Sequence, residues 1–330
     1  MPHCRMGQMP KILVTGGAGY IGSITSHHLL NRGFEVVVID DLSRGHRGNA
    51  APERLHVLRL QQTEKVAELL HSVDAVVHFA AHSAVGESMR EPESYFSNNV
   101  GGTVSLLEAM ARAGVHRLVF SSTAAVYGNP EKTPIPENAP LTPVNPYGES
   151  KAIVEKVLRD LDHYGRLRSI ALRYFNASGA EPSAGLGEDH NPETHLIPLL
   201  FRAVTTGEPI QIFGDDYATS DGTCIRDYIH VTDLATAHLA ALDYLMAGGR
   251  SGAFNVGTGK GQTVMEVLRT VEKVTGKRVP YKIAPRRDGD PTELVADSTA
   301  LQNTLGWQPQ CSGIDDIVRD AWAYYQLKFS

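Results

Sequence analysis

Three side chains in the first half of the chain have the types and spacing needed for acid–base chemistry on a hydroxyl group. Tyr147 and Lys151 form a Tyr-x-x-x-Lys pair in a predicted helix, where positions i and i+4 share one face. A phenol has a pKa near ~10, but a nearby ammonium group favours the phenolate. A phenolate can accept a hydroxyl proton while a hydride leaves the same carbon. Thr123, at the end of a predicted strand, can hydrogen-bond the reacting oxygen.

A glycine-rich turn, Gly16-Gly17-Ala18-Gly19-Tyr20-Ile21-Gly22, lies between a predicted strand and a predicted helix. Gly16 permits the tight turn, Gly19 lets the backbone approach a pyrophosphate, and Gly22 allows the helix to pack closely on the sheet. The start of the helix then offers N–H groups and a partial positive charge to the phosphates. This arrangement predicts a dinucleotide site.

The second predicted strand ends at Asp40, about twenty residues after the glycine turn. A carboxylate at this position accepts hydrogen bonds from ribose hydroxyls and repels a 2′-phosphate, which favours NAD over NADP. Arg44 and Arg47 follow closely and could instead bind a phosphate. We expect NAD as the cofactor.

These groups must be positioned by a regular alternation of strands and helices in residues 11–176. The strands are nearly continuous in Val, Ile, Leu, Phe and Ala, as in parallel sheets covered on both faces. The pattern predicts an α/β fold with a doubly wound parallel Rossmann sheet. The expected strands are 12–14, 34–39, 55–60, 75–81, 118–122 and 169–174. The expected helices are an amphipathic stretch that follows the glycine turn and ends at Leu30, and the segments 63–71, 93–113 and 146–163.

The character of the sequence changes after residue 176. Residues 177–225 are rich in Gly, Pro and Asp, and later segments mix short strands with helices at 196–206, 232–245, 264–275 and 313–327. We expect residues 1–10 to be a disordered extension and 11–176 the NAD-binding domain, with 226–250 returning to it. Residues 177–330 would form a smaller, interleaved α/β substrate domain.

Composition narrows the class of protein. The 330-residue chain has a formal net charge of −6 and 42% hydrophobic residues, typical of a globular protein. No Lys/Arg run suggests a nucleic-acid partner, and no apolar run approaches the ~18 residues of a membrane span. Cys4, Cys224 and Cys311 are scattered, which disfavours disulfides and a zinc site. We expect a cytoplasmic protein without a metal ion.

Longer motifs extend from about Lys11 to the C-terminus. They include Ser-Ser-Thr-Ala-Ala-Val-Tyr-Gly (121–128), Tyr-Gly-Glu-Ser-Lys (147–151), Arg-Tyr-Phe-Asn (173–176), Asp-Gly-Thr-Cys-Ile-Arg-Asp-Tyr (221–228) and Ala-Pro-Arg-Arg-Asp-Gly-Asp (284–290). With the glycine turn, they resemble the UDP-glucose 4-epimerases of the extended short-chain dehydrogenase/reductase superfamily. The last two motifs are the more specific to that family.

The resemblance implies that Tyr147, aided by Thr123 and Lys151, takes the proton of a sugar 4-hydroxyl while tightly held NAD accepts the hydride. The 4-keto sugar then rotates about its bond to the diphosphate, and the reduced cofactor returns the hydride to the other face of the sugar. Matching the family's motifs assigns the cofactor contacts to Gly16, Gly19, Tyr20, Ile21, Gly22, Asp40, Asp41, Leu42, Ser43, Arg44, Gly45, Phe79, Ala80, Ala81, His82, Ser83, Asn98, Thr123, Tyr147, Lys151 and Phe175.

The same matching implies a UDP-sugar substrate and a homodimer with a four-helix interface, built on the helical segments near 100–113 and 153–162. The guanidinium groups of Arg226 and Arg287 suit a diphosphate. The implied substrate contacts are Asn176, His195, Leu196, Gln211, Ile212, Phe213, Arg226, Arg287, Asp290 and Leu294.

Four positions depart from the family's pattern. The stretch 58–61 has no acid for adenine, although Gln61 could substitute, and Ser83 replaces a lysine found in some members. Thr123 stands in place of a serine and keeps the hydroxyl. Leu294 stands where some members have tyrosine, and this smaller side chain suggests room for an N-acetyl group on the sugar.

Several other functions were weighed. A nucleotide-sugar 4,6-dehydratase would need Asp and Glu after the catalytic threonine, where this chain has Ala124 and Ala125. Epimerases of UDP-N-acetylglucosamine or UDP-glucuronate stay open, as does an NAD-sensing protein without catalysis, because a fold alone does not prove activity. The spacing of Glu188, His190 and His195 matches no zinc motif.

Overall fold

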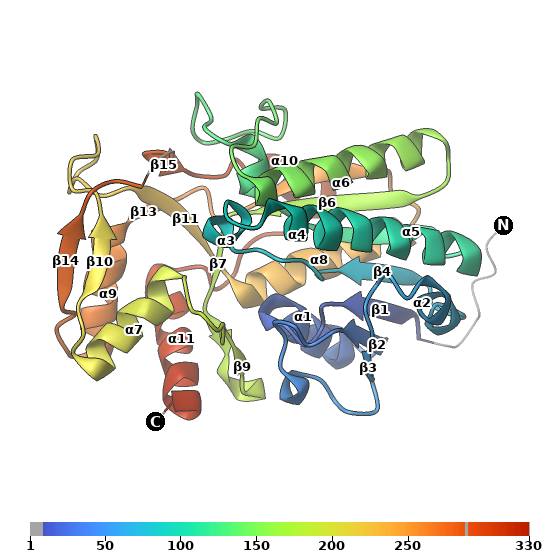
Figure 1. Cartoon of the computed structure of the whole chain (residues 1–330), viewed down its shortest axis with the longest axis horizontal. Helices are drawn as coiled ribbons and strands as arrows, with labels where there is room; N and C mark the ends of the chain where they lie inside the picture. The colour runs from blue at the N-terminus through green and yellow to red at the C-terminus, as the bar shows by residue number, and fades with distance from the viewer. Residues whose placement is uncertain (1–8, 288–289, 330) are drawn as a thin grey trace.

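The computed structural model describes residues 9–287 and 290–329, so residues 1–8 of the predicted extension lie outside the described residues. Its centre is a seven-stranded parallel sheet, which confirms the predicted doubly wound fold (Figure 1). The strands in spatial order are β12 (Gly252–Val256), β6 (Arg168–Tyr174), β5 (Arg117–Thr123), β4 (Ala75–His78), β1 (Lys11–Thr15), β2 (Glu35–Asp40) and β3 (Leu55–Val57).

Helices cover both faces of this sheet. One face packs against α1 (Tyr20–Asn31), α8 (Val231–Met246) and α10 (Thr299–Leu305), and the other against α2 (Thr63–Leu69), α5 (Gly102–Ala113) and α6 (Pro146–His163) (Figure 1). Each layer buries a separate set of aliphatic side chains, which explains the nearly continuous apolar strands. No helix in the described part of the chain is both long and apolar enough to cross a membrane.

Three predicted elements were wrong in extent. The strand predicted at 75–81 ends at His78. The third strand ends at Val57 rather than at residue 60, because its partner β2 ends at Asp40, which is paired with Val57. The predicted helix 93–113 is divided into α4 (Pro92–Tyr95), a π-helical turn (Phe96–Gly101) and α5. Such turns insert one extra residue into a helix and are frequent at functional sites.

A continuous segment from the middle of the second half returns to the sheet. Strand β12 forms the edge of the sheet next to β6, and α8 packs on α1.

The remaining elements form the other part of the molecule around the buried side chains of α7 (Leu196–Thr206), α9 (Val264–Thr275) and α11 (Ile314–Phe329). Its strands are β7 (Asn176–Ser178), β8 (Ala180–Glu181), β9 (Leu186–Gly187), β10 (Ile210–Phe213), β11 (Ile225–His230), β13 (Gly261–Thr263), β14 (Tyr281–Ala284) and β15 (Glu293–Leu294). The other short elements of the described residues are the helix α3 (Val85–Ser88) and three 3₁₀ turns (Arg47–Asn49, Ala124–Tyr127, Pro182–Ala184).

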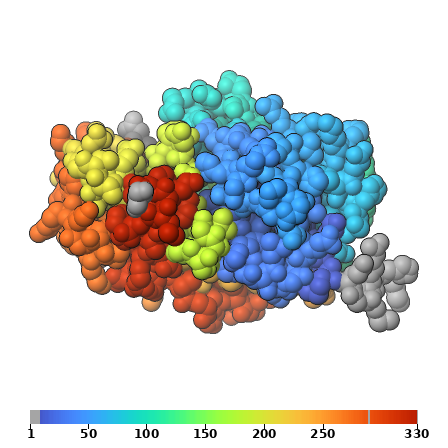
Figure 2. All heavy atoms as spheres, turned by 90° about the horizontal axis from the view of Figure 1, so that it is seen from below, coloured from blue at the N-terminus to red at the C-terminus, as the bar shows by residue number. Residues whose placement is uncertain are grey.

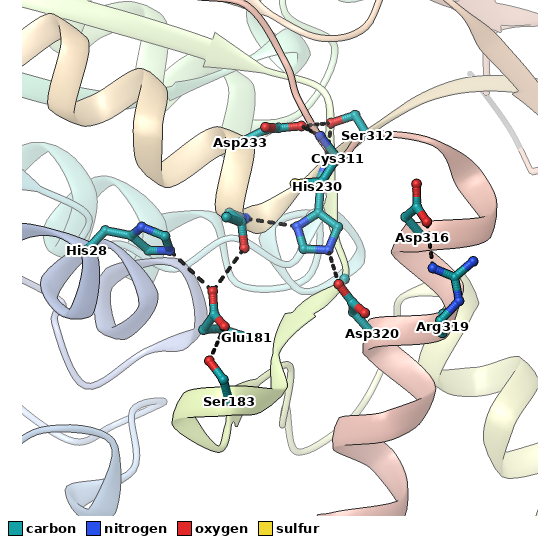
Figure 3. A network of polar contacts seen from close by, with 12 residues as sticks. His28, Glu181, Ser183, His230, Asp233, Cys311, Ser312, Asp316, Arg319 and Asp320 are labelled. Atoms are coloured by element: carbon teal, nitrogen blue, oxygen red, sulfur yellow. Dashed lines mark hydrogen bonds and ion pairs between the residues drawn. The ribbon is translucent and has the colours of Figure 1, made fainter. Parts of the chain in front are cut away.

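A partly buried polar network joins the two parts of the molecule (Figure 3). Glu181 on β8 contacts His28 on α1, with 3.3 Å between Oε2 and Nε2. His230 accepts a hydrogen bond from Thr232 N at its Nδ1 atom, so its Nε2 carries the proton that faces Asp320 on α11 at 3.2 Å. In the space-filling view, the segment around β8 and β9 lies between α11 and the blue residues around α1 (Figure 2). These contacts fix α11 relative to the sheet.

Candidate active site

All residues predicted for catalysis, cofactor binding and substrate binding line one cavity of about 1640 Å³. One wall is the carboxyl edge of the parallel sheet, where doubly wound folds bind ligands. The opposite wall comes from segments after residue 176, including β10, β11 and the start of α7. The structure therefore brings the predicted residues together, and the role of each one stays a prediction.

The glycine turn forms a backbone cradle at the floor of this cavity. A Cβ atom on Gly16, whose φ is +70°, would lie 2.6 Å from Ala80 N, and one on Gly22 would lie 2.2 Å from Gly16 O. Helix α1 begins at Tyr20 after its N-cap residue Gly19, and its first turn lines the cavity. A surface of this kind, made of backbone at the positive end of a helix, fits a pyrophosphate.

Asp40 holds the glycine turn against the loop that follows β2. Its Oδ2 accepts a hydrogen bond from Ala18 N at 3.0 Å, and its Oδ1 accepts one from Leu42 N at 2.8 Å. Burial raises the pKa of Asp40, and these two backbone donors oppose that rise. Arg44, which could instead bind a 2′-phosphate, forms an ion pair with Glu87. This arrangement suits ribose hydroxyls, as in NAD.

Lys151 is almost completely buried, with 3% of its surface exposed. Its Nζ atom donates a hydrogen bond to Ser121 O at 2.7 Å, which ties α6 to the end of β5. Burial lowers the pKa of Lys151 to about 7, and the carboxylate of Glu155 opposes this shift.

Tyr147 lies one helical turn before Lys151 on the same face of α6. Burial raises the pKa of Tyr147, and a hydrogen bond with the Thr123 hydroxyl opposes that rise. The Thr123 hydroxyl also accepts a hydrogen bond from Ala125 N at 3.2 Å, which orients it at the strand end. A phenol with these neighbours becomes a base when positive charge is close to it.

Asn99 is a positioning residue that sequence reasoning missed. From the π-helical turn, its side chain accepts a hydrogen bond from His82 N at 2.8 Å and donates to His82 O and Ser150 Oγ, each at 3.0 Å. It therefore fixes the predicted cofactor loop 79–83 against the catalytic helix. The pair Asn98-Asn99 was a usable signal, because asparagine is a poor former of helix interiors.

The end of the cavity predicted to hold adenine is lined by more residues than the sequence prediction assigned to the cofactor. Leu58, Arg59, Leu60 and Gln61 all line the cavity, after the end of β3. The Gln61 side chain lies close to α5, with its Nε2 atom 3.4 Å from the position of a Cβ on Gly102. An amide at this place can hydrogen-bond a base edge in the absence of an acid.

The opposite wall carries the predicted guanidinium groups. Arg226 on β11 forms an ion pair with Asp290 and lies opposite Leu294 in the sheet register. The Arg287 guanidinium stacks 4.0 Å from the centre of the Phe213 ring, at the end of β10. Residues 288 and 289 of this motif lie outside the described residues. The two guanidinium groups suit the phosphates of a nucleoside diphosphate, and the nearby aromatic ring suits its base.

His195 caps the start of α7 within a cluster of ionisable groups. Its Nδ1 atom lies 2.5 Å from Glu188 Oε1, and this carboxylate raises the pKa of His195 well above its usual value. Although burial alone would raise it, His195 and His190 hold the pKa of Glu188 at about 2. With Glu193, these side chains place four donor atoms within 4.8 Å of one another. Direct pairing between the histidines and the carboxylates accounts for these distances.

Comparisons with known proteins give a consistent result. The model of the "NAD dependent epimerase/dehydratase family" matches residues 12–257. A UDP-glucose 4-epimerase of Halalkalibacterium halodurans is 48% identical over 318 residues, covering 96% of this chain and 95% of that protein. The Brucella ovis UDP-glucose 4-epimerase, solved with NAD, superposes with a TM-score of 0.93 at 43% identity, covering 96% and 98% of the two chains. The Bifidobacterium longum enzyme, solved with NAD+ and UDP, has a TM-score of 0.89 at 36% identity, with the same coverage of 96% and 98%.

Proposed function

The chain belongs to the NAD dependent epimerase/dehydratase family, and from this premise we propose that it interconverts UDP-galactose and UDP-glucose with tightly bound NAD. The observation that carries this proposal is one continuous cavity. It joins Thr123, Tyr147 and Lys151 on one wall to Arg226 and Arg287 on the other. One end of the cavity can thus hold a sugar hydroxyl group that loses a proton and a hydride, and the other end can hold a diphosphate.

The residues of the sheet edge act on the sugar. Bound NAD supplies the acceptor and donor for the hydride at sugar C4. Tyr147 takes the proton of the 4-hydroxyl and returns it to the product, while the Thr123 hydroxyl orients the reacting oxygen. Lys151, as an ammonium ion, favours the phenolate form of Tyr147. The backbone cradle around Gly16 and the carboxylate of Asp40 hold the cofactor through the whole cycle.

Release of the hydroxyl at C6 is disfavoured by the residues that follow Thr123. Ala124 and Ala125 offer no acid or base next to the sugar, and both line the cavity. A 4-keto sugar formed here can therefore only be reduced again, after turning about its bond to the diphosphate. Epimerisation rather than dehydration is the result.

The test is to purify the protein, determine its NAD content and add UDP-galactose without external cofactor. We expect steady conversion to UDP-glucose over many turnovers. A need for stoichiometric added NAD would instead indicate a dehydrogenase. No conversion by NAD-loaded protein would favour an NAD-sensing role.

The range of sugars is a second question at the same site. Leu294 lines the cavity and, like Phe175, packs against the buried cluster that includes Ala124, Val126 and Tyr127. Because leucine is smaller than tyrosine, we propose that the site also accepts UDP-N-acetylglucosamine. Turnover of that sugar by the wild type and its loss in Leu294→Tyr would support this. No turnover in the wild type would reject it, and UDP-glucuronate serves as a third substrate to compare.

We also propose a cytoplasmic homodimer that pairs through α5 and α6. A hollow of about 500 Å³ between these helices is lined by apolar side chains, among them Leu107, Met110 and Leu161. Val104 on α5 and Tyr164 after α6 are exposed large side chains on the same two segments. Light scattering should give the mass of a dimer for the wild type and of a monomer for Val104→Glu. A monomeric wild type would contradict the proposal.

A further inference from the structure

The catalytic helix carries a second buried charge, Glu155, which the mechanism above does not use. Glu155 is 2% exposed, and its partner Arg173 on β6 is 3% exposed. The guanidinium contacts both carboxylate oxygens, with 2.9 Å from Nε to Oε1 and 2.6 Å from Nη2 to Oε2. The Ser122 hydroxyl donates to Oε1 at 2.5 Å. A bidentate, hydrogen-bonded pair of this kind is rigid.

This pair locks the catalytic helix to three strands of the sheet. Arg173 also donates to the Tyr127 hydroxyl at 2.8 Å, and that hydroxyl donates to Asn255 Oδ1 on β12 at 2.7 Å. On β5, two successive residues contact α6, because Ser121 O accepts from Lys151 and Ser122 donates to Glu155. The next residue of β5 is Thr123. The network therefore sets the position of α6 along β5, and with it the distance from Tyr147 to Thr123.

The electrostatic role follows from the helical spacing. Glu155 lies four residues after Lys151, so the two side chains share one face of α6. Burial drives the pKa of Lys151 down, and the Glu155 carboxylate acts in the opposite direction. Apart from Tyr147, whose phenolate form the Lys151 ammonium group itself favours, Glu155 is the one charged group among the described residues that is seen to shift the pKa of Lys151. Tyr147 and Tyr174 have pKa values raised by burial, and burial lowers the pKa of His78 on β4 to about 3.

Building on the proposed function, we propose that Glu155 and Arg173 form a positioning pair that keeps the Lys151 amine protonated and α6 in register with β5. Glu155 supplies the negative charge. Arg173 holds the carboxylate in place and, as a cation, weakens the effect of that charge on the pKa of Lys151. Opposite effects follow for the two partners. Loss of Glu155 removes an anion from the surroundings of Lys151, whereas loss of Arg173 leaves that anion uncompensated.

The direct test is the titration of Lys151 in the NAD-bound enzyme, followed by NMR of ¹³Cε-labelled lysine. The Lys151 signal is identified by its absence in Lys151→Met. In Glu155→Gln we expect the midpoint to fall by about one pH unit or more, the size typical of a lost neighbouring charge. In Arg173→Gln we expect it to rise. Asp160→Asn, which removes an exposed carboxylate of the same helix, should leave it unchanged.

Because a single substitution leaves a buried charge unpaired, the double variant Glu155→Gln/Arg173→Gln is made as well. It restores neutrality, and its Lys151 midpoint should lie below the wild type but above Glu155→Gln. If Glu155→Gln does not fold, Arg173→Gln and the double variant decide the matter. An unchanged Lys151 midpoint in folded variants, or shifts of the same sign in both single variants, overturns the proposal.

The pH profile of turnover provides a second readout. Since protonated Lys151 supports the Tyr147 phenolate, the alkaline limb of the kcat profile should move to lower pH in Glu155→Gln and to higher pH in Arg173→Gln. A merely structural role would lower kcat equally at every pH. The NMR titration needs no substrate, so it still tests the pair if UDP-galactose proves not to be turned over. Absence of turnover in the wild type counts against the proposed function alone.

Discussion

The two walls of the cavity are built in different ways. The sheet-edge wall consists of backbone and of buried side chains, such as Lys151, each with a defined partner. The opposite wall adds charged side chains on short strands and loops to its apolar ones. Arg226, whose side chain is 12% exposed, pairs there with Asp290, whose side chain is 24% exposed.

This difference separates the two tasks of the site. A reaction at one carbon needs groups whose positions and pKa values are fixed, and close packing with low dielectric provides both. Binding of a flexible diphosphate sugar needs cations that can leave an internal partner, as Arg226 would leave Asp290. We therefore expect substitutions in the sheet-edge wall to lower kcat or abolish cofactor binding. Those in the opposite wall should mainly raise KM.

The largest effect is expected for Tyr147→Phe, because it removes the proton acceptor and changes little else in the packing. We expect kcat to fall by roughly 10²–10⁴-fold while NAD stays bound. Initial rates with UDP-galactose and the NAD content of the purified protein measure both quantities. Tyr281→Phe, at an exposed tyrosine of β14, is the matched control. Near-normal turnover by Tyr147→Phe would place the base elsewhere.

A Gly22→Ala variant probes the cradle on the same wall. Its Cβ would lie 2.2 Å from Gly16 O, a clash with backbone that only a shift of α1 can relieve. We expect the protein to be purified with little NAD and to lose about 1–3 kcal/mol of stability, the usual cost of overpacking. Gly48→Ala has nothing within 4 Å of its Cβ and should bind NAD like the wild type. Equal NAD content in the two variants would be inconsistent with the predicted pyrophosphate site.

Arg226→Gln on the opposite wall should show the complementary pattern. The loss of a cation that contacts the diphosphate would raise KM for UDP-galactose by roughly 10–100-fold, the equivalent of about 1.4–3 kcal/mol of binding. We expect kcat to change by less than about threefold, because uniform binding is removed and the chemistry is not. Arg278→Gln, at a 93% exposed side chain, is the control. A lower kcat with an unchanged KM would contradict the claim that the opposite wall serves substrate binding rather than chemistry.

Sequence alone could predict most of the sheet-edge wall. The glycine turn, Asp40 and the Tyr147/Lys151 pair are local patterns, in which the fold of a few consecutive residues already places the functional group. The parallel sheet was predictable for the same reason, because apolar strands alternate with helices.

The features that were not predicted depend on contacts between distant segments. The ion pair of Arg44 with Glu87 and that of Glu155 with Arg173 join residues with no common motif. The π-helical turn follows from the packing of Asn99 against the 79–83 loop rather than from helix periodicity. The early end of β3 reflects the length of its neighbour. In each case tertiary contacts override a local preference, and one sequence does not reveal them.

The most direct test of the whole scheme follows one hydrogen atom. UDP-galactose carrying deuterium at C4 is converted by the purified enzyme, with unlabelled NAD added in excess, and the product is analysed by NMR and mass spectrometry. We expect UDP-glucose that retains the deuterium at C4, because the sheet-edge wall holds the cofactor throughout the cycle while the opposite wall holds the diphosphate. Deuterium found in the solvent or in the free nicotinamide pool would contradict that scheme.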